Sequence, residues 1–231
     1  MNYKYYEKKI NDILYKCNIE SGIEIITYML LDEIIENKNL SLVAIDSLQK
    51  TNRFLSEGGF SDLSIVSNDF LYDDPSKGKC YGCVEVKHIR KNLKSVRWQV
   101  IGQLITFNNI LVTNGLDWEF YSLKKHHQQS NCNSEKIDME KELQKVKELF
   151  VSYKKYNDEL LKLKKLEDYE KNPDYILKNK ELNNINNNLD NYNISKPVWT
   201  ISLTQSRYTP YTIDNMQYIE LLNKLNQIQW K

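Results

Sequence analysis

Hydrophobic periodicity changes several times within residues 20–123, and the order of these changes constrains the fold more than any other feature of the sequence. Apolar side chains recur every three to four residues in two segments, which predicts amphipathic helices at 20–36 and 95–108. The other segments alternate or run apolar, as strands do. In residues 60–67, Leu63 and Ile65 are apolar while Asp62 and Ser64 are polar, which predicts a strand with one apolar and one polar face. The predicted strands are 40–49, 60–67, 81–89, 109–113 and 118–123. This order of helices and strands predicts an α/β domain with a mixed sheet flanked by helices.

The sequence beyond residue 123 has a different character. Residues 134–182 are rich in Lys, Glu and Leu, which predicts a helical hairpin or a long helical arm, and 183–193 is an Asn-rich segment expected to be a loop. The remaining predicted elements are a helix at 3–17, a strand at 198–203 and a helix at 215–229. Because the chain returns to a strand, we expect the arm to be an insertion. The expected domains are a core at 1–123, an arm and loop at 124–197, and a strand and helix at 198–231 that complete the core.

Composition excludes several classes of protein without indicating a partner. The 231 residues suffice for one large domain, or for one domain with an insertion. With 32 Lys and Arg against 31 Asp and Glu, any nucleic-acid binder would need its positive charge concentrated locally. The four cysteines are irregularly spaced, which argues against a disulfide framework. The polar N-terminus and the lack of a run of about 18 apolar residues predict neither a signal peptide nor a membrane span, so we expect a cytoplasmic protein.

One predicted strand combines an apolar and a charged face. Side chains alternate along a strand, so Glu85 and Lys87 share one face while Val84 and Val86 share the other. If the strand that contains Asp62 pairs with this one, Asp62 lies beside Glu85. Adjacent carboxylates repel each other unless a cation joins them, and such oxygen ligands suit Mg²⁺, with Mn²⁺ expected to substitute. Lys87 could then orient an attacking water, help to deprotonate it, or stabilise developing charge.

The order of these residues resembles a known motif. Asp62 followed by Glu85-Val86-Lys87 resembles the D…(D/E)-X-K signature of the PD-(D/E)XK nuclease superfamily. Residues 103–107, from Gln103 to Phe107, resemble the Q-x-x-x-Y motif of some branches. Residues 110–121 are similar to the "TNG…W.fY" stretch in nuclease domains of type I restriction subunits and their stand-alone relatives.

The match has departures and one open assignment. Ser61 stands where the motif name has a proline, which many members also lack, and Phe107 replaces the usual tyrosine. Such domains carry an acidic residue on the helix before the sheet. Glu24 is the better match for that acid, and Glu20 is the second choice.

The resemblance covers roughly residues 20–123 and implies a restriction-endonuclease-like fold. It also implies a Mg²⁺-dependent endonuclease that hydrolyses phosphodiester bonds of DNA, in restriction, repair or phage defence. A homodimer would supply two active sites if both strands are cut. The residues expected at the site are Asp62, Glu85 and Glu24 as metal ligands, Lys87 beside the attacking water, and Gln103 as support for the catalytic strand or the nucleic-acid backbone.

Basic residues are concentrated in the sequence around this motif. Phosphate contacts from such residues would make binding sensitive to salt. The expected phosphate-binding residues are Lys79, Arg90, Lys91, Lys94 and Arg97, with Lys77 nearby.

Each of these residues also has a structural interpretation. Glu85 and Lys87 could form an ordinary surface ion pair, Asp62 could cap the turn after Gly58-Gly59, and Gln103 and Glu24 could simply face solvent. The basic residues could be a solvated face. Cys80 and Cys83 lack a second pair of zinc ligands and are expected to be small strand residues, and His126-His127 is expected to lie in a polar loop.

Two other functions fit the same residues. The chain could be a catalytically silent nucleic-acid-binding or assembly subunit whose helical arm contacts partners. It could also be a nuclease that cleaves RNA, since the phosphate chemistry is shared.

Overall fold

The computed structural model describes residues 1–45, 51–123, 139–206 and 208–231. His126, His127 and Cys132, together with parts of the predicted segments 40–49 and 134–182, lie outside the described residues. The chain divides into two compact units. The first comprises Met1–Ser122 and Pro197–Lys231, and the second comprises Leu123–Lys196.

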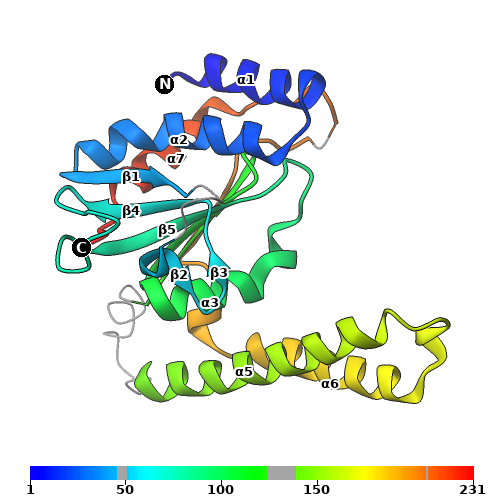
Figure 1. Cartoon of the computed structure of the whole chain (residues 1–231). Coiled ribbons are helices and arrows are strands. Elements are labelled where there is room, and N and C mark those ends of the chain that lie inside the picture. The colour runs from blue at the N-terminus through cyan, green and yellow to red at the C-terminus, as the bar shows by residue number, and fades with distance from the viewer. Residues whose placement is uncertain (46–50, 124–138, 207) are drawn as a thin grey trace, which may run out of the picture. The chain divides into compact units, whose positions relative to one another are not determined.

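The first unit is built on a six-stranded sheet with the order β1-β4-β5-β6-β7-β8 (Figure 1). β5 and β6 are parallel and every other neighbouring pair is antiparallel, so the predicted α/β fold with a mixed sheet is confirmed. The strands are β1 (Leu40–Ala44), β4 (Leu63–Ser67), β5 (Cys80–Val86), β6 (Asn109–Thr113), β7 (Asp117–Ser122) and β8 (Trp199–Ser202).

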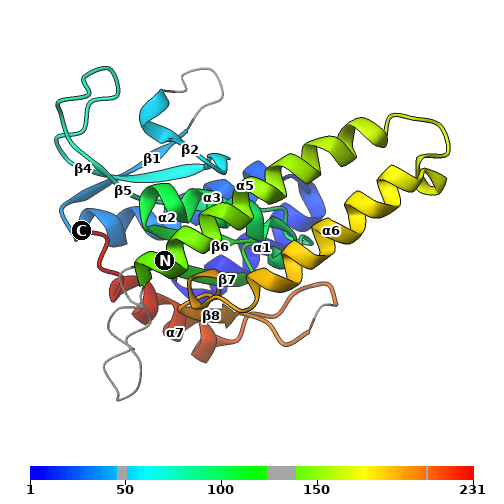
Figure 2. The same ribbon diagram turned by 90° about the horizontal axis from the view of Figure 1, so that it is seen from below.

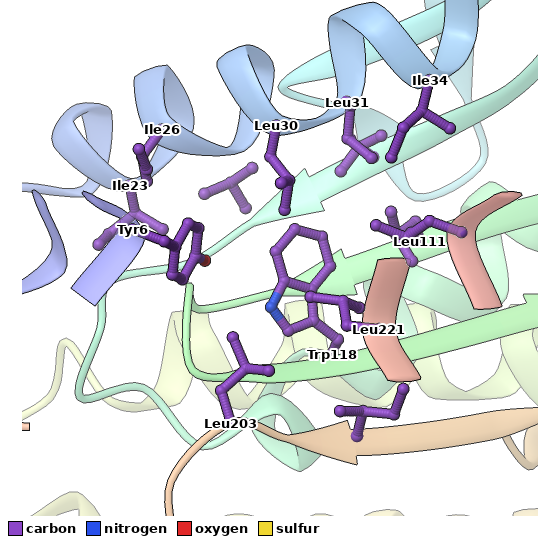
Figure 3. Packing of buried hydrophobic residues seen from close by; sticks show 14 of the residues in the cluster. Tyr6, Ile23, Ile26, Leu30, Leu31, Ile34, Leu111, Trp118, Leu203 and Leu221 are labelled. Carbon is purple, nitrogen blue, oxygen red and sulfur yellow. The ribbon is translucent and has the colours of Figure 1, made fainter. Parts of the chain in front are cut away.

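Helices cover both faces of this sheet. α1 (Tyr3–Lys16), α2 (Glu20–Glu36) and α7 (Asn215–Asn226) contribute to one apolar core. Figure 3 shows Leu30 of α2 and Leu221 of α7 around the indole of Trp118, which is fully buried. α3 (Arg97–Phe107) lies on the opposite face, where it is preceded by the 3₁₀ turn η2 (Leu93–Val96) and contacts a small hairpin. That hairpin consists of β2 (Leu55–Ser56) and β3 (Gly59–Phe60), after the 3₁₀ turn η1 (Asn52–Phe54).

The alternation in residues 60–67 predicted a strand with one polar face, and this prediction is wrong. The regular strand is β4, and its residues Leu63 to Val66 are all buried, including Ser64 at 0% exposure. The small polar side chain of Ser64 therefore lies in the interior and not on a solvent-facing side. Gly59 and Phe60 belong to the separate hairpin.

The second unit contains a helical hairpin. α5 (Met139–Leu163) and α6 (Pro173–Leu189) lie side by side, with the 3₁₀ turn η3 (Tyr169–Lys171) between them and η4 (Asn193–Ser195) after them (Figure 2). The predicted loop at 183–193 is wrong as far as Leu189, because α6 continues through the Asn-rich stretch. Ile185 and Leu189 are one turn apart and both are buried, so packing overrides the weak helix propensity of asparagine. Of the helices described, none is both long and apolar enough to cross a membrane.

The buried hydroxyl of Tyr6 connects α1 to the turn between β6 and β7. It donates a hydrogen bond of 2.7 Å to the carbonyl of Gly115, and burial raises the pKa of the phenol, which therefore remains a donor. Tyr6→Phe should lower the free energy of unfolding by about 1–3 kcal/mol, because the buried carbonyl loses its partner. Urea unfolding followed by tryptophan fluorescence measures this in the first unit, which contains all four tryptophans.

Tyr5→Phe provides a matched control. The neighbouring Tyr5 is 41% exposed, so this variant should unfold within about 0.5 kcal/mol of the parent protein. Equal losses in the two variants would contradict a specific role for the Tyr6 hydroxyl.

Candidate active site

Pairing of β4 with β5 brings Asp62 next to Glu85. Leu63 pairs with Val84 in the antiparallel register, so the residue before Leu63 lies opposite the residue after Val84. One carboxylate oxygen of Asp62, Oδ2, accepts a hydrogen bond of 2.6 Å from the backbone N–H of Val86. The side chain of Asp62 therefore bonds to the neighbouring strand and does not cap the turn after Gly58-Gly59.

Glu85 is a buried carboxylate held by three donors. It is 1% exposed, and its Oε1 accepts hydrogen bonds from the Lys87 ammonium and, at 2.7 Å, from Gln99 Nε2. Its Oε2 accepts from Gln103 Nε2. Gln103 is fully buried, so it does not face solvent and it supports Glu85 rather than a nucleic-acid backbone. Gln99 was missed in the sequence, although its position one helical turn before Gln103 is the signal that could have identified it.

Gly58 sets how closely the hairpin before Asp62 approaches α3. A Cβ atom at this position would lie 2.2 Å from the carbonyl oxygen of Gln99 and 2.9 Å from the backbone nitrogen of Gln103. Any larger residue would push the hairpin away from the helix that carries both glutamines. Gly58 therefore acts through a close backbone contact, as well as through the turn that the sequence indicated.

Both candidate acids of α2 lie near this cluster but differ in their contacts. Glu20 accepts a hydrogen bond of 2.8 Å from the backbone N–H of His88 and lies 3.9 Å from Lys87 Nζ. Glu24 is half-buried, and its carboxylate makes no hydrogen bond or ion pair within the described part of the chain. Burial raises the pKa of Glu24, and the nearby charges of Asp62 and Glu20 raise it further.

Burial and mutual repulsion dominate the electrostatics of the cluster. Burial, followed by the charge of Asp62, raises the pKa of Glu85 to about 7. The pKa of Asp62 is also raised by burial, although the Val86 N–H and the Lys87 charge oppose the shift. Burial acts against the Lys87 ammonium, but Glu85, Asp62 and Glu20 together raise its pKa. Lys87 is thus held as a cation that donates hydrogen bonds.

The oxygens of this cluster fit a hard divalent cation. Asp62 Oδ1 accepts no hydrogen bond from any described residue, and Glu85 Oε2 has one donor, so each can accept a further ligand. Among the residues that the structure describes, no three His, Cys, Asp or Glu side chains converge as an all-protein metal site. That arrangement is compatible with Mg²⁺, which binds through one or two carboxylates and retains waters or substrate oxygens as its other ligands.

The predicted phosphate-binding residues do not form one strip in the structure. Lys79 precedes the first residue of β5, about 20 Å along the strand from Glu85. Arg90 and Lys91 lie in the loop after β5, three and four residues beyond Lys87. Lys94 and Arg97 lie near Glu119, where their charges oppose the rise in its pKa that burial causes.

The Thr113-Asn114-Gly115 turn has structural contacts on both sides. Asn114 Oδ1 accepts hydrogen bonds from the N–H groups of Leu116 and Asp117, at 3.0 and 2.7 Å. Asn114 Nδ2 donates to the carbonyl of Lys91 at 2.9 Å. The turn therefore fixes the loop that follows the Glu85 strand.

Cys80 and Cys83 behave as strand residues. Both lie on β5, where burial raises the pKa of the Cys80 thiol to about 11 and also raises the pKa of the Cys83 thiol well above its ordinary value. No zinc cluster includes them within the described ranges.

The raised pKa of Glu85 predicts a specific pH dependence of stability. A glutamate in the unfolded chain has a pKa of about 4.3, whereas the pKa of Glu85 in the folded protein is about 7. Between these two pH values Glu85 retains a proton that the unfolded chain releases. Stability therefore falls as pH rises through this window. Glu85→Gln, in EDTA, should remove this component, so its stability relative to the parent protein should increase across the window and then level off. Urea unfolding at a series of pH values measures the difference.

The exposed residue Glu36 offers a control for that experiment. Glu36→Gln should follow the parent protein at every pH. A constant difference between Glu85→Gln and the parent across the same range would contradict burial as the cause of the shift.

Comparison with known proteins gives no match: no family model, no curated protein and no solved structure is similar to this chain. The function is therefore inferred from the geometry of the Asp62, Glu85 and Lys87 cluster and from the sequence motifs.

Proposed function

We propose that this chain is a metal-dependent nuclease that hydrolyses phosphodiester bonds, with Asp62, Glu85 and Lys87 at its reactive centre. The observation that carries the proposal is the position of a raised-pKa carboxylate pair beside a retained ammonium at the end of two paired strands. Carboxylates can hold a divalent cation for phosphate hydrolysis, and a neighbouring ammonium can stabilise the charge that develops on the phosphate. The mixed sheet is compatible with the restriction-endonuclease-like fold that the motifs imply.

The roles follow from the contacts of each side chain. Asp62 and Glu85 would hold Mg²⁺ or Mn²⁺, with Glu24 contributing through a bridging water, since the three carboxylates do not converge on one point in the described structure. A bound cation of this kind lowers the pKa of a coordinated water and screens phosphate charge. Lys87, as an ammonium, would orient the attacking water and stabilise negative charge that develops on the phosphate.

Supporting residues keep the reactive groups in place. Gln99 and Gln103 fix both oxygens of Glu85, so this carboxylate has little rotational freedom. Glu20 bonds to the backbone of His88 and so fixes the chain directly after Lys87. We class these three as positioning residues.

DNA is the proposed substrate, in a restriction, repair or phage-defence setting, because the motifs resemble those of restriction nucleases. RNA remains the alternative substrate of the same chemistry. Cleavage of both strands would favour a homodimer with two such sites.

One observation favours a catalytically silent protein with this fold. The three donors around Glu85 already balance its charge, as they would in a buried hydrogen-bond network whose role is only structural. In that case the helical hairpin of the second unit would mediate partner contacts. The same assays distinguish the two functions.

Cleavage assays test the reactive centre. The purified protein with Mg²⁺ should cut DNA or RNA, EDTA should abolish cutting, and Lys87→Ala should lower the rate by about 10²–10⁴-fold, because the ammonium next to the phosphate is lost. Gel analysis of labelled duplex DNA, single-stranded DNA and RNA measures the rates.

Lys79→Ala is the matched control, since it removes one positive charge at the other end of β5. It should change the rate less than Lys87→Ala does. An absence of cleavage of all three substrates, with Lys87→Ala indistinguishable from the parent, would refute the nuclease assignment.

Cation binding can be tested without cleavage. At a Mg²⁺ concentration about 100 times its Kd, the free energy of unfolding should rise by about 2.7 kcal/mol. Asp62→Asn should lose this gain, whereas Glu36→Gln should retain it. Thermal unfolding monitored by tryptophan fluorescence measures the shift in the first unit, and an equal shift in Asp62→Asn would place the cation elsewhere.

A further inference from the structure

A cavity of about 650 Å³ lies within the first unit, next to the loop that continues from Lys87. Its walls come from three segments that are far apart in the sequence. They are residues 89–92 after β5, Asn114 and Asp117 at the β6–β7 turn, and Tyr208, Thr209 and Tyr211 after β8. We propose that this cavity binds one unpaired nucleotide of the substrate strand, so that the enzyme prefers single-stranded or frayed DNA. This inference rests on the proposed nuclease function.

Two cations supply a phosphate-binding wall. Arg90 and Lys91 are both exposed, and neither side chain makes an ion pair or a hydrogen bond with the residues that the structure describes. Arg90 is three residues beyond Lys87, so their Cα atoms are at most about 11 Å apart. A strand whose scissile phosphate lies at Lys87 therefore passes within reach of Arg90.

The loop that presents these cations is fixed on two sides. The N–H of His88 is bonded to Glu20, and the carbonyl of Lys91 accepts from Asn114 Nδ2. Asn114 is itself 1% exposed. Because this backbone is already held in place, binding at Arg90 and Lys91 does not have to order the loop, although the two side chains still lose rotamer freedom.

The segment after β8 adds an aromatic ring to the lining of the cavity. Tyr208 is 86% exposed, and its backbone N–H donates to Ser206 Oγ at 3.2 Å. Three residues later, Tyr211 is buried, and its N–H and carbonyl both bond to Asn11 at 2.8 Å. A lone exposed tyrosine is ordinary, but this ring borders a cavity that also has two cations. Unpaired bases stack on aromatic rings in this way.

Asp117 adds a carboxylate to the lining of the cavity. Its Oδ1 accepts from Ser202 at 2.8 Å and its Oδ2 from Asn114 Nδ2 at 3.3 Å, so internal donors partly balance its charge. The cations Arg90 and Lys91 suit a phosphate and the ring of Tyr208 suits a base, and together these two features correspond to one nucleotide.

Equilibrium binding in EDTA tests this site in the full chain without cleavage. A fluorescein-labelled oligothymidylate and a blunt duplex of the same length are compared by fluorescence anisotropy. The single strand should bind more tightly than the duplex. Tyr208→Ala should weaken single-strand binding by about 5- to 150-fold, since stacking contributes about 1–3 kcal/mol per base. Tyr208→Phe retains the ring and should bind within about twofold of the parent.

Two controls separate the site from general surface effects. Tyr72→Ala removes another exposed tyrosine, 58% exposed, and should leave binding unchanged. The double variant Arg90→Ala, Lys91→Ala should reduce the slope of log affinity against log salt by about 1.4, whereas Lys4→Ala, Lys8→Ala, two exposed residues of α1, should leave it unchanged. The proposal would be overturned if Tyr72→Ala weakened binding as much as Tyr208→Ala, or if the control lysine pair reduced the salt slope as much as Arg90→Ala, Lys91→Ala.

The outcomes for the site and for the nuclease activity are separable. Cleavage by the parent protein with unaltered binding by Tyr208→Ala would overturn the cavity site and leave the nuclease intact. Tyr208-dependent binding without cleavage would support the cavity and refute the nuclease. Thymidine 5′-monophosphate that competes as strongly as the oligonucleotide would identify a site for free nucleotides and overturn the strand proposal.

Discussion

Burial of the Glu85 carboxylate is the constraint on which the rest of the site depends. A charge with 1% exposure is costly unless donors surround it, and Lys87, Gln99 and Gln103 provide those donors. The two glutamines fix where α3 lies on the sheet, and Gly58 fixes where the preceding hairpin lies on α3. The same side-chain atoms thus contribute to the stability of the fold and to the proposed chemistry. Because Asp62 and Glu85 repel each other, a bound cation would stabilise the cluster.

Local geometry explains which parts of the site could be predicted from the sequence. The alternation around Glu85 and Lys87 follows from strand pleating alone, so their shared face required no knowledge of the fold. The position of Asp62 required a strand pairing, which no single segment determines. The contact of Gln99 with Glu85 could not be predicted from the sequence, because it depends on how closely α3 packs against the sheet. The basic residues were grouped by sequence proximity, but β5 separates Lys79 from the others.

Packing also explains where the predicted elements differ from the structure. Most helices and strands of the first unit begin and end near their predicted bounds, because each buries one continuous apolar stripe or run. Ser64 suggested a solvent-facing side that does not exist, since Leu63 to Val66 of β4 are all buried. The asparagines after residue 182 suggested a loop, but Ile185 and Leu189 keep α6 helical.

The points at which the second unit leaves and rejoins the sheet lie on neighbouring strands. The chain departs after β7 at Ser122 and returns at Pro197, and Val198 bonds immediately to Phe120. The register between β7 and β8 is therefore set by residues outside the insertion. Evolution can lengthen, shorten or exchange such a cassette at little thermodynamic cost, because closing a longer loop adds only a small entropic penalty. Relatives with the same sheet and cluster could thus carry quite different appendages at this edge.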